Sequence, residues 1–251
     1  MRTKELVEVA LKTGEILLCN GAEVYRVEET ITRVFSSYGK DCEVFVLLSG
    51  IFITAREEDG NDITLVKRIK GHTFNLKKIE LVNSFSRELV TEPLDYRSAM
   101  ETLDAIQHAT TYSFKTKVLC SGATAFAYAL LFNGSIWDAI AALFISIFVF
   151  LVKTRISKTG FFQFFEFFVS GILVGSLSFL AAKAFPFMDI YKIIIGAVMI
   201  LVPGVAITTG IKDALYGDIV SSLYRISEAV FIAVAVGSGV GIILSIGLRY
   251  L

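Results

Sequence analysis

Residues Met199–Glu228 read MILVPGVAITTGIKDALYGDIVSSLYRISE. The segment begins inside an apolar span and fills with charged residues before the next apolar span starts. The Pro203-Gly204 pair would free backbone groups that hydrocarbon cannot hydrogen-bond, so packed neighbours or a wet cavity must satisfy them. Broken membrane helices often bind substrate in transporters. The sequence therefore predicts a broken helix here, with Pro203 and Gly204 either at a substrate site or at a packed kink.

Charged residues are divided unevenly between the two halves of the chain. Residues 1–116 hold 33 of the 48 Lys, Arg, Asp and Glu residues, and the other 135 residues share the remaining 15. We therefore predict a cytoplasmic α+β domain over residues 1–116 and a transmembrane helical domain over residues 117–251. The net charge of zero lacks the basic footprint of a nucleic-acid binder, so no nucleic-acid partner is expected.

The first half is predicted to contain helices around a small antiparallel sheet. Apolar residues recur at helical spacing in two N-terminal segments, and the second of these ends at Gly39. Short apolar runs separated by turn residues then predict strands. The expected helices are about Leu6–Leu17, Val24–Tyr38, Asn75–Thr91 and Tyr96–Tyr112. The expected strands are Glu43–Leu48, Ile51–Arg56 and Ile63–Ile69.

Five apolar segments in the second half predict a polytopic α-helical membrane domain, because about 20 residues cross the hydrocarbon. They are Val118–Phe132, Ile136–Val152, Phe164–Phe185, Ile190–Thr209 and Ala229–Leu248. Four spans are the alternative, if Val118–Val152 forms a re-entrant pair. The Gly-x-x-x-Gly pairs Gly171–Gly175 and Gly237–Gly241 predict close helix packing, within the chain or between subunits.

Loop charges predict the orientation. With five spans, seven loop Lys and Arg residues share a side with the first half, against three on the opposite side. The positive-inside rule then predicts a multi-pass plasma (inner) membrane protein with a cytoplasmic N-terminal domain. The three cysteines and the isolated His72 and His108 show no metal-binding pattern, so no metal or other cofactor is expected.

Four charged residues follow the Pro-Gly break: Asp213, Asp218, Arg225 and Glu228. A carboxylate partly removed from water can load and release a proton near neutral pH, so this group is a candidate cytoplasmic gate or proton carrier. The alternative is a solvated interfacial loop with ordinary ion pairs. We favour the functional interpretation for the group as a whole.

Five further residues are weaker candidates. Glu166 lies among aromatic residues and is either a proton site or the interfacial end of a span. Asp138 opens the second span, where a helix cap is favoured over a residue at the exported mouth. In the first half, Glu23, Arg26 and Glu28 are candidates for regulation or substrate entry, although Arg26 at helical spacing from Glu23 also fits a structural ion pair.

With these elements in place, the sequence resembles the threonine/serine exporter family over essentially its whole length. Three motifs carry the resemblance: Gly21-Ala-Glu-Val-Tyr-Arg-Val-Glu28, Asn133-Gly-Ser-Ile-Trp-Asp138, and Leu201-Val-Pro-Gly204 continuing to Lys212-Asp213, Gly217-Asp218, Arg225 and Glu228. Thr208-Thr209 depart from the pattern, since the resemblance leads us to expect an Asn-type residue nearby. Thr208 is a candidate substrate residue, together with Pro203 and Gly204.

The resemblance implies an exporter of a small polar substrate, either an amino acid such as threonine or serine or a C4-dicarboxylate. It also implies the split form of the family, which works in the lipid bilayer with a second small membrane subunit as an oligomer. We expect the proton gradient to drive transport and no enzymatic activity. The alternatives are a regulatory or scaffold subunit and a membrane-bound hydrolase, although no Gly-x-Ser-x-Gly or His-Glu-x-x-His motif supports the hydrolase.

Overall fold

The computed structural model describes residues 1–110, 112–158, 160 and 162–247. The chain forms two compact units, each described below by itself. The first comprises Met1–Thr111 and Val205–Ile226, and the second comprises Tyr112–Gly204 and Ser227–Leu251. Residues 205–226 therefore pack with the first half of the chain, although the sequence division at residue 116 assigned them to the membrane domain.

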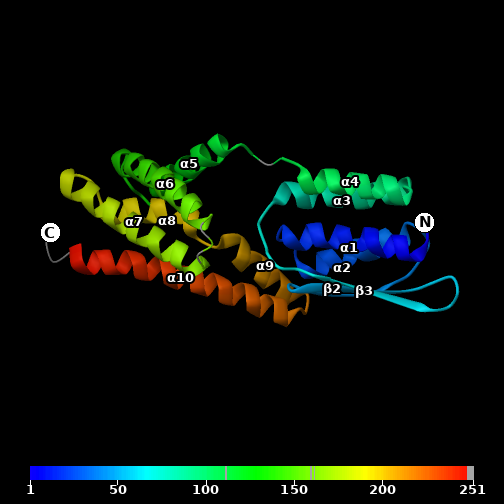
Figure 1. Cartoon of the computed structure of the whole chain (residues 1–251). Helices are drawn as coiled ribbons and strands as arrows, with labels where there is room; N and C mark the ends of the chain where they lie inside the picture. Colours follow the sequence, from blue (N-terminus) through cyan, green and yellow to red (C-terminus); the bar gives the residue numbers. More distant parts are fainter. Residues whose placement is uncertain (111, 159, 161, 248–251) are drawn as a thin grey trace. The chain divides into compact units, whose positions relative to one another are not determined.

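The first unit is built in layers around two helices, α1 (Thr3–Cys19) and α2 (Val24–Ser36). These two helices lie between the pair α3 (Leu76–Thr91) and α4 (Tyr96–His108) on one side and a sheet on the other (Figure 1). The apolar seam of α2 forms because Val24, Val27 and Ile31 recur at helical spacing and are buried. Gly39, with φ of +65°, follows the end of α2 as predicted.

The sheet has three antiparallel strands in the order β1 (Glu43–Leu47), β2 (Gly50–Arg56) and β3 (Asp62–Arg68). Alternation along β2 buries Ile51 and Ile53 against the helices and leaves Phe52 on the outer face. The predicted small antiparallel sheet is confirmed, with strand ends within one residue of those expected. Helix α4 ends at His108, earlier than the predicted Tyr112.

The remaining elements of the first unit are α9 (Gly204–Leu215) and the first turns of α10 (Ile219–Gly247). Only Tyr216, Gly217 and Asp218 separate these helices, and Gly217 adopts a φ of +92° there. The interpretation of residues 212–228 as a solvated loop is therefore wrong. The charged side chains had suggested a loop, but several of them point into the protein, where they find partners far away in the sequence.

The second unit is helical, and its helices pack through small residues. It contains α5 (Phe114–Leu131), α6 (Ile136–Ser157), α7 (Gln163–Ala184), α8 (Ile190–Val198), the 3-10 turn η1 (Met199–Leu201) and α10 from Ser227. A Cβ atom on Gly196 would lie only 2.7 Å from Ala125 O and 2.8 Å from Ala129 Cβ. Only glycine therefore allows α8 to approach α5 this closely.

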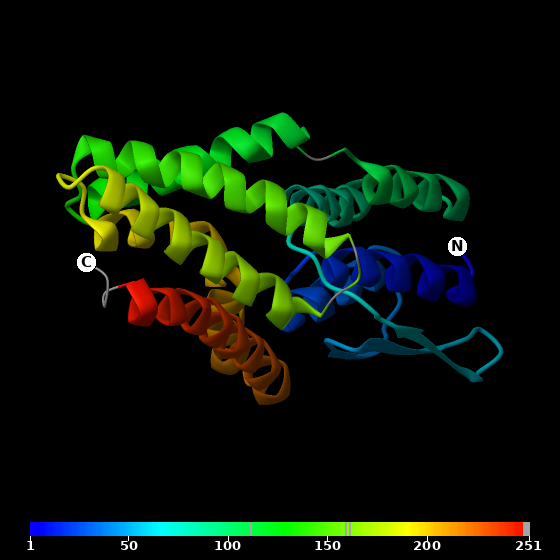
Figure 2. The ribbon, with the colours of Figure 1, turned by 60° about the vertical axis from the view of Figure 1, so that its left-hand side comes forward.

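Helices α7 and α10 lie side by side through a glycine contact (Figure 2). A Cβ atom on Gly171 would lie 2.5 Å from Val236 O, and one on Gly239 would lie 2.4 Å from Phe168 O. The predicted close packing of the Gly171–Gly175 pair is confirmed within the chain. Gly237 and Gly241 face open space instead, so their pair makes no such contact in this unit.

Three helices are long and apolar enough to cross a membrane: α6, α7 and α10. A fourth span is possible if the bent pair Ile190–Leu201 and Gly204–Leu215 is counted as one. The described residues thus give three or four candidate spans, fewer than the five predicted from the sequence. Helix α5 has only 18 residues and carries Lys115 and Lys117 in its first turn, which explains the difference.

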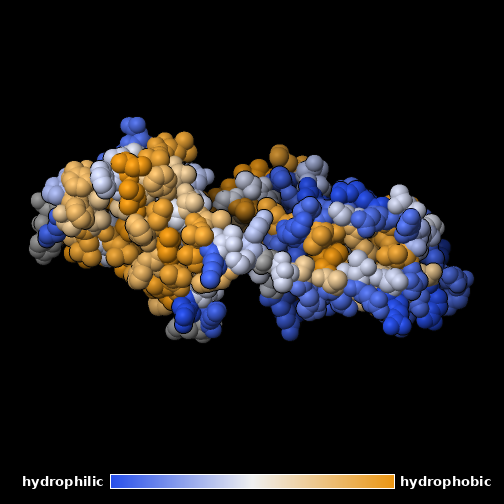
Figure 3. Space-filling view, turned by 90° about the horizontal axis from the view of Figure 1, so that it is seen from above, coloured by the Kyte–Doolittle hydropathy of each residue, from blue (hydrophilic) through white to orange (hydrophobic). Residues whose placement is uncertain are grey.

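On the face seen in Figure 3, the second unit is broadly apolar, whereas the first unit is largely hydrophilic over α3 and α4. Large side chains such as Phe144, Leu180 and Phe231 are more than half exposed on the second unit. Exposed apolar side chains of this kind are expected for a unit that lies in lipid.

Candidate functional site

Asp213 of α9 binds the N-terminus of α2. Its side chain is completely buried, and Oδ1 accepts a hydrogen bond of 3.0 Å from the backbone N–H of Val24. Val24 is the first residue of α2, and the N-cap residue Glu23 makes no side-chain cap of its own. Asp213 therefore caps α2 from another helix, where the positive end of the helix dipole favours a carboxylate.

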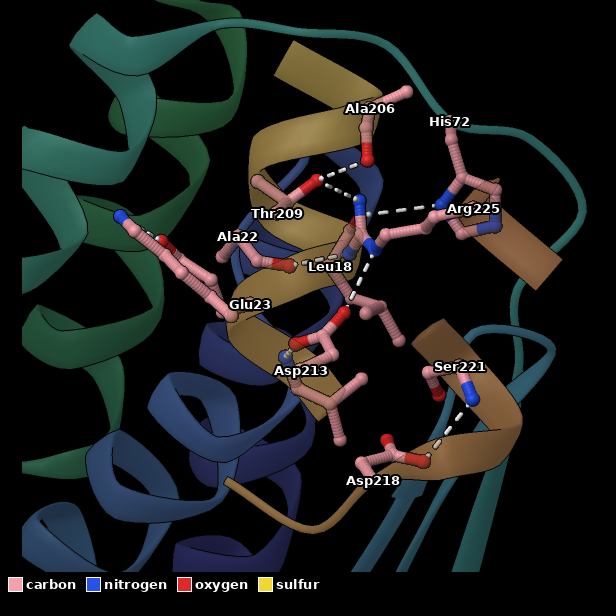
Figure 4. Close-up of polar contacts among 12 residues, drawn as sticks. Leu18, Ala22, Glu23, His72, Ala206, Thr209, Asp213, Asp218, Ser221 and Arg225 are labelled. Atoms are coloured by element: carbon pink, nitrogen blue, oxygen red, sulfur yellow. Dashed lines mark hydrogen bonds and ion pairs between the residues drawn. The ribbon is translucent and has the colours of Figure 1, made fainter. Parts of the chain in front are cut away.

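Arg225 of α10 joins the same site from the other side (Figure 4). Its Nε lies 2.9 Å from Asp213 Oδ2, its Nη2 donates to Ala22 O at 2.7 Å, and its Nη1 donates to Thr209 Oγ1 at 3.3 Å. The arginine is only 4% exposed. One guanidinium thus links α9, α10 and the α1–α2 loop, which we define as residues 20–23.

The Asp213–Arg225 contact is a buried ion pair whose geometry leaves hydrogen-bonding capacity unused. Five buried side-chain atoms among the described residues lack a hydrogen-bond partner, and four of them lie here: Asp213 Oδ2, Asp218 Oδ2, Ser221 Oγ and Arg225 Nε. Native proteins satisfy the large majority of buried polar atoms. A concentration of exceptions in 13 residues therefore distinguishes this site from the rest of the chain.

Glu23 makes two further charged contacts at the rim of the site. Its Oε1 accepts from Lys212 Nζ at 2.9 Å, and its Oε2 lies 3.5 Å from Arg26 Nε. Burial opposes ionisation of this carboxyl, but the Lys212 hydrogen bond and the nearby Arg26 outweigh it and lower the pKa of Glu23. Beside this contact the rings of Tyr25 and Tyr216 stack with centroids 3.7 Å apart.

Glu28 and Asp218 occupy the neighbouring part of the same unit. Glu28 Oε1 accepts the backbone N–H of Val46 at 3.1 Å, and Asp218 Oδ1 accepts that of Ser221 at 3.1 Å. Burial raises the pKa of Glu28, and the negative charge of Asp218 raises it further. Asp218 is placed to cap the start of α10, while its Oδ2 is buried and has no hydrogen-bond partner in the described part of the chain.

Six predicted residues are thus brought together, from the first and third motifs: Glu23, Arg26, Glu28, Asp213, Asp218 and Arg225. We call them, with Thr209, Lys212 and Ser221, the polar cluster. Sequence reasoning singled out Thr208, whose hydroxyl donates to Val205 O, whereas it is Thr209 that contacts Arg225. The helical spacing of Thr209, Asp213 and Tyr216 could have revealed their common face, had the segment been recognised as a helix.

The other predicted residues lie outside the polar cluster. Asp138 belongs to the capping box of α6, in which Ser135 is the N-cap residue and Asp138 Oδ2 accepts from Ser135; the favoured cap interpretation agrees with this geometry. Asp138 Oδ1 also accepts the backbone N–H of Asp189. Glu166 of α7 is buried, with Lys153 Nζ 4.0 Å away. Glu228 is half-buried, with no hydrogen bond or ion pair to any described residue.

The predicted helix break is present at Pro203. Val202 is extended, with ψ of 128°, as expected for a residue before proline, and α9 begins at Gly204. A Cβ atom on Gly204 would meet nothing within 4 Å, so this glycine is not packed tightly against described residues.

Comparison with known proteins gives one family and two relatives. The model of the family described as threonine/serine exporter (ThrE) matches residues 8–247. A probable threonine/serine exporter of Mycobacterium tuberculosis is 20% identical over 250 residues, covering 98% of this chain and 46% of that protein. A probable succinate transporter subunit, YjjP, of Klebsiella aerogenes is 23% identical over 239 residues, covering 94% of this chain and 92% of that protein.

The chain therefore spans about half the length of the Mycobacterium tuberculosis relative and nearly all of the Klebsiella aerogenes one. No solved structure matches the chain.

Proposed function

Because the chain belongs to the threonine/serine exporter family, we propose that it is an exporter subunit that moves small polar metabolites out of the cytoplasm. The substrate class is amino acids of the threonine and serine type or C4-dicarboxylates. The names of the two relatives, a probable threonine/serine exporter and a probable succinate transporter subunit, support these two classes.

The observation that carries the mechanism is the buried Asp213–Arg225 pair. It holds α9 and α10 against the α1–α2 loop through the Val24 N–H, Ala22 O and Thr209 contacts. A buried ion pair is stable only while both charges are present, because either charge alone pays for its desolvation without compensation. Loss of one charge would weaken the hold of both helices on the loop, so in this proposal the pair is the inner gate.

A proton is the simplest agent for opening this gate. Protonation of Asp213 would remove its attraction for Arg225 while leaving one carboxyl oxygen to accept the Val24 N–H. Ionisable groups buried at such positions are typical of proton-coupled transporters. We therefore propose that the proton gradient drives export. We also propose that residues 1–116 lie in the cytoplasm, as the loop charges predict.

The proposal includes a second membrane subunit. The Klebsiella aerogenes relative is named a subunit, and the Mycobacterium tuberculosis relative is about twice as long as this chain. Three or four spans in this chain would then form part of a larger oligomeric pathway.

Efflux from loaded proteoliposomes tests the function directly. Labelled threonine, serine and succinate are loaded in turn, and efflux is measured with and without the partner subunit and with and without a proton gradient. We expect gradient-dependent efflux of at least one of the three. If none is exported under any of these combinations, the exporter proposal fails.

A further inference from the structure

A cavity of about 220 Å³ lies in the first unit beside the polar cluster. Three parts of the unit line it: the β1–β2 turn, the segment that follows β3, and the first turns of α10. These parts are far apart in the sequence and meet only in the folded unit.

The cavity combines apolar walls with polar groups that have bonding capacity to spare. Leu48 and Ile69 supply buried apolar surface. Ser221 also lines the cavity; it is 2% exposed, and its Oγ has no hydrogen-bond partner among the residues that the structure describes. A buried hydroxyl without a partner is costly unless something else binds it.

Two nitrogen-bearing side chains also line the cavity. Lys70 is exposed and makes no ion pair or hydrogen bond with the described part of the chain. His72 Nδ1 lies 3.2 Å from Leu18 O, and since a carbonyl only accepts, Nδ1 carries the proton and Nε2 is left for another partner. Among the described lining residues there is no carboxylate to compete for Lys70.

From this lining we propose that the cavity binds a small carboxylate metabolite, with the carboxylate on Lys70 and the Ser221 hydroxyl and a second polar group near His72 Nε2. Its volume is below the about 300–1,000 Å³ of drug-sized sites, which suits a metabolite of a few carbons. The inference rests on the proposed function for its choice of carboxylates, since these are the exported classes.

The position of the site gives it a regulatory role. Ser221 and Arg225 are one turn apart on α10, so a ligand bound at Ser221 acts on the helix that carries half of the gate pair. His72 bonds to Leu18 at the end of α1, directly before the α1–α2 loop that receives Arg225. Binding in the cavity therefore couples the metabolite concentration to both sides of the gate, the helix α10 that carries Arg225 and the α1–α2 loop.

Binding to the purified full chain in detergent tests the inference, with succinate, threonine and inorganic phosphate as probes. Lys70→Met is compared with Lys77→Met, an exposed lysine on α3 that is paired with Glu80. We expect succinate or threonine to bind, Lys70→Met to weaken binding about tenfold or more through loss of a charge-assisted contact, and Lys77→Met to leave it unchanged. Hydrogen exchange should also slow in residues 47–49 and 219–225 when the metabolite is added.

Equal binding by the Lys70→Met and wild-type chains would overturn the inference, and so would exchange protection that spares both segments. Phosphate binding as tight as that of the carboxylates would also overturn it, because a lipid headgroup would then explain the site. Both lysines are exposed, so neither variant should unfold. These results are separate from the efflux test: Lys70-dependent binding without efflux refutes only the exporter proposal, and efflux without Lys70-dependent binding refutes only this inference.

Discussion

Asp213→Asn should destabilise the first unit, because it leaves the buried Arg225 without its counter-charge. Removing one partner of a buried ion pair costs about 3–5 kcal/mol. The lower end applies here, since the asparagine oxygen can still accept from Val24 and Arg225 keeps its contacts with Ala22 and Thr209. A loss of about 3 kcal/mol corresponds to a decrease of about 6–12 °C in Tm for a chain of this size.

Thermal unfolding of the purified protein in detergent measures this decrease. The matched control is Glu101→Gln, which removes a carboxylate from an ion pair with Arg97. The side chain of Arg97 is 86% exposed and that of Glu101 is 66% exposed. That pair is solvated, so the control should unfold at the same temperature as the wild-type protein. The double variant Asp213→Asn/Arg225→Met removes both charges and should recover most of the lost stability. If Asp213→Asn unfolds at the same temperature as Glu101→Gln, the ion pair does not stabilise the unit and the reasoning is refuted.

Three further predictions follow from individual contacts. Gly239→Ala would place a Cβ atom 2.4 Å from Phe168 O, so it should lower the Tm of the protein, whereas Gly241→Ala, which meets open space, should not; equal Tm values would refute the α7–α10 packing. Glu28→Gln should stabilise the protein more at pH 7 than at pH 4, measured by urea unfolding. The pKa of Glu28 is raised in the folded protein, so Glu28 favours folding most at a pH below its unfolded pKa, and this contribution is lost as the pH rises through its folded pKa. A stability difference between variant and wild type that does not change with pH would contradict this. Thr209→Val should cost about 1 kcal/mol through loss of the Arg225 hydrogen bond, measured by the same unfolding, while Thr208→Val, on an exposed side chain, should cost less; the reverse order would refute the assignment.

Much of the fold could be predicted because its signals are local. The spacing of Val24, Val27 and Ile31 specifies the buried face of α2, and the turn residues between short apolar runs specify the antiparallel sheet. The resemblance to the exporter family could also be drawn from three short motifs, and the family match over residues 8–247 confirms it.

The site was harder to predict because its contacts join residues far apart in the sequence. Asp213 meets Val24 and Arg225 meets Ala22 across about two hundred residues, and no local pattern records such a pairing. The same charges made α9 and the start of α10 resemble a solvated loop, since burial of a charged side chain becomes understandable only when its partner is known. The motifs identified most of the participating residues, but only the structure shows that the first and third motifs form one cluster.

Efflux by the double variant Asp213→Asn/Arg225→Met tests most directly the claim that the buried pair is a gate. The variant is compared with the wild-type protein and with Glu101→Gln, reconstituted in equal amounts with the partner subunit and the exported substrate. If the pair gates export, the double variant should be folded and yet export about tenfold or more slowly than either, because it can no longer open and close this contact by charge. Wild-type efflux from the double variant would show that the pair serves stability alone, and would support a scaffold role for this chain.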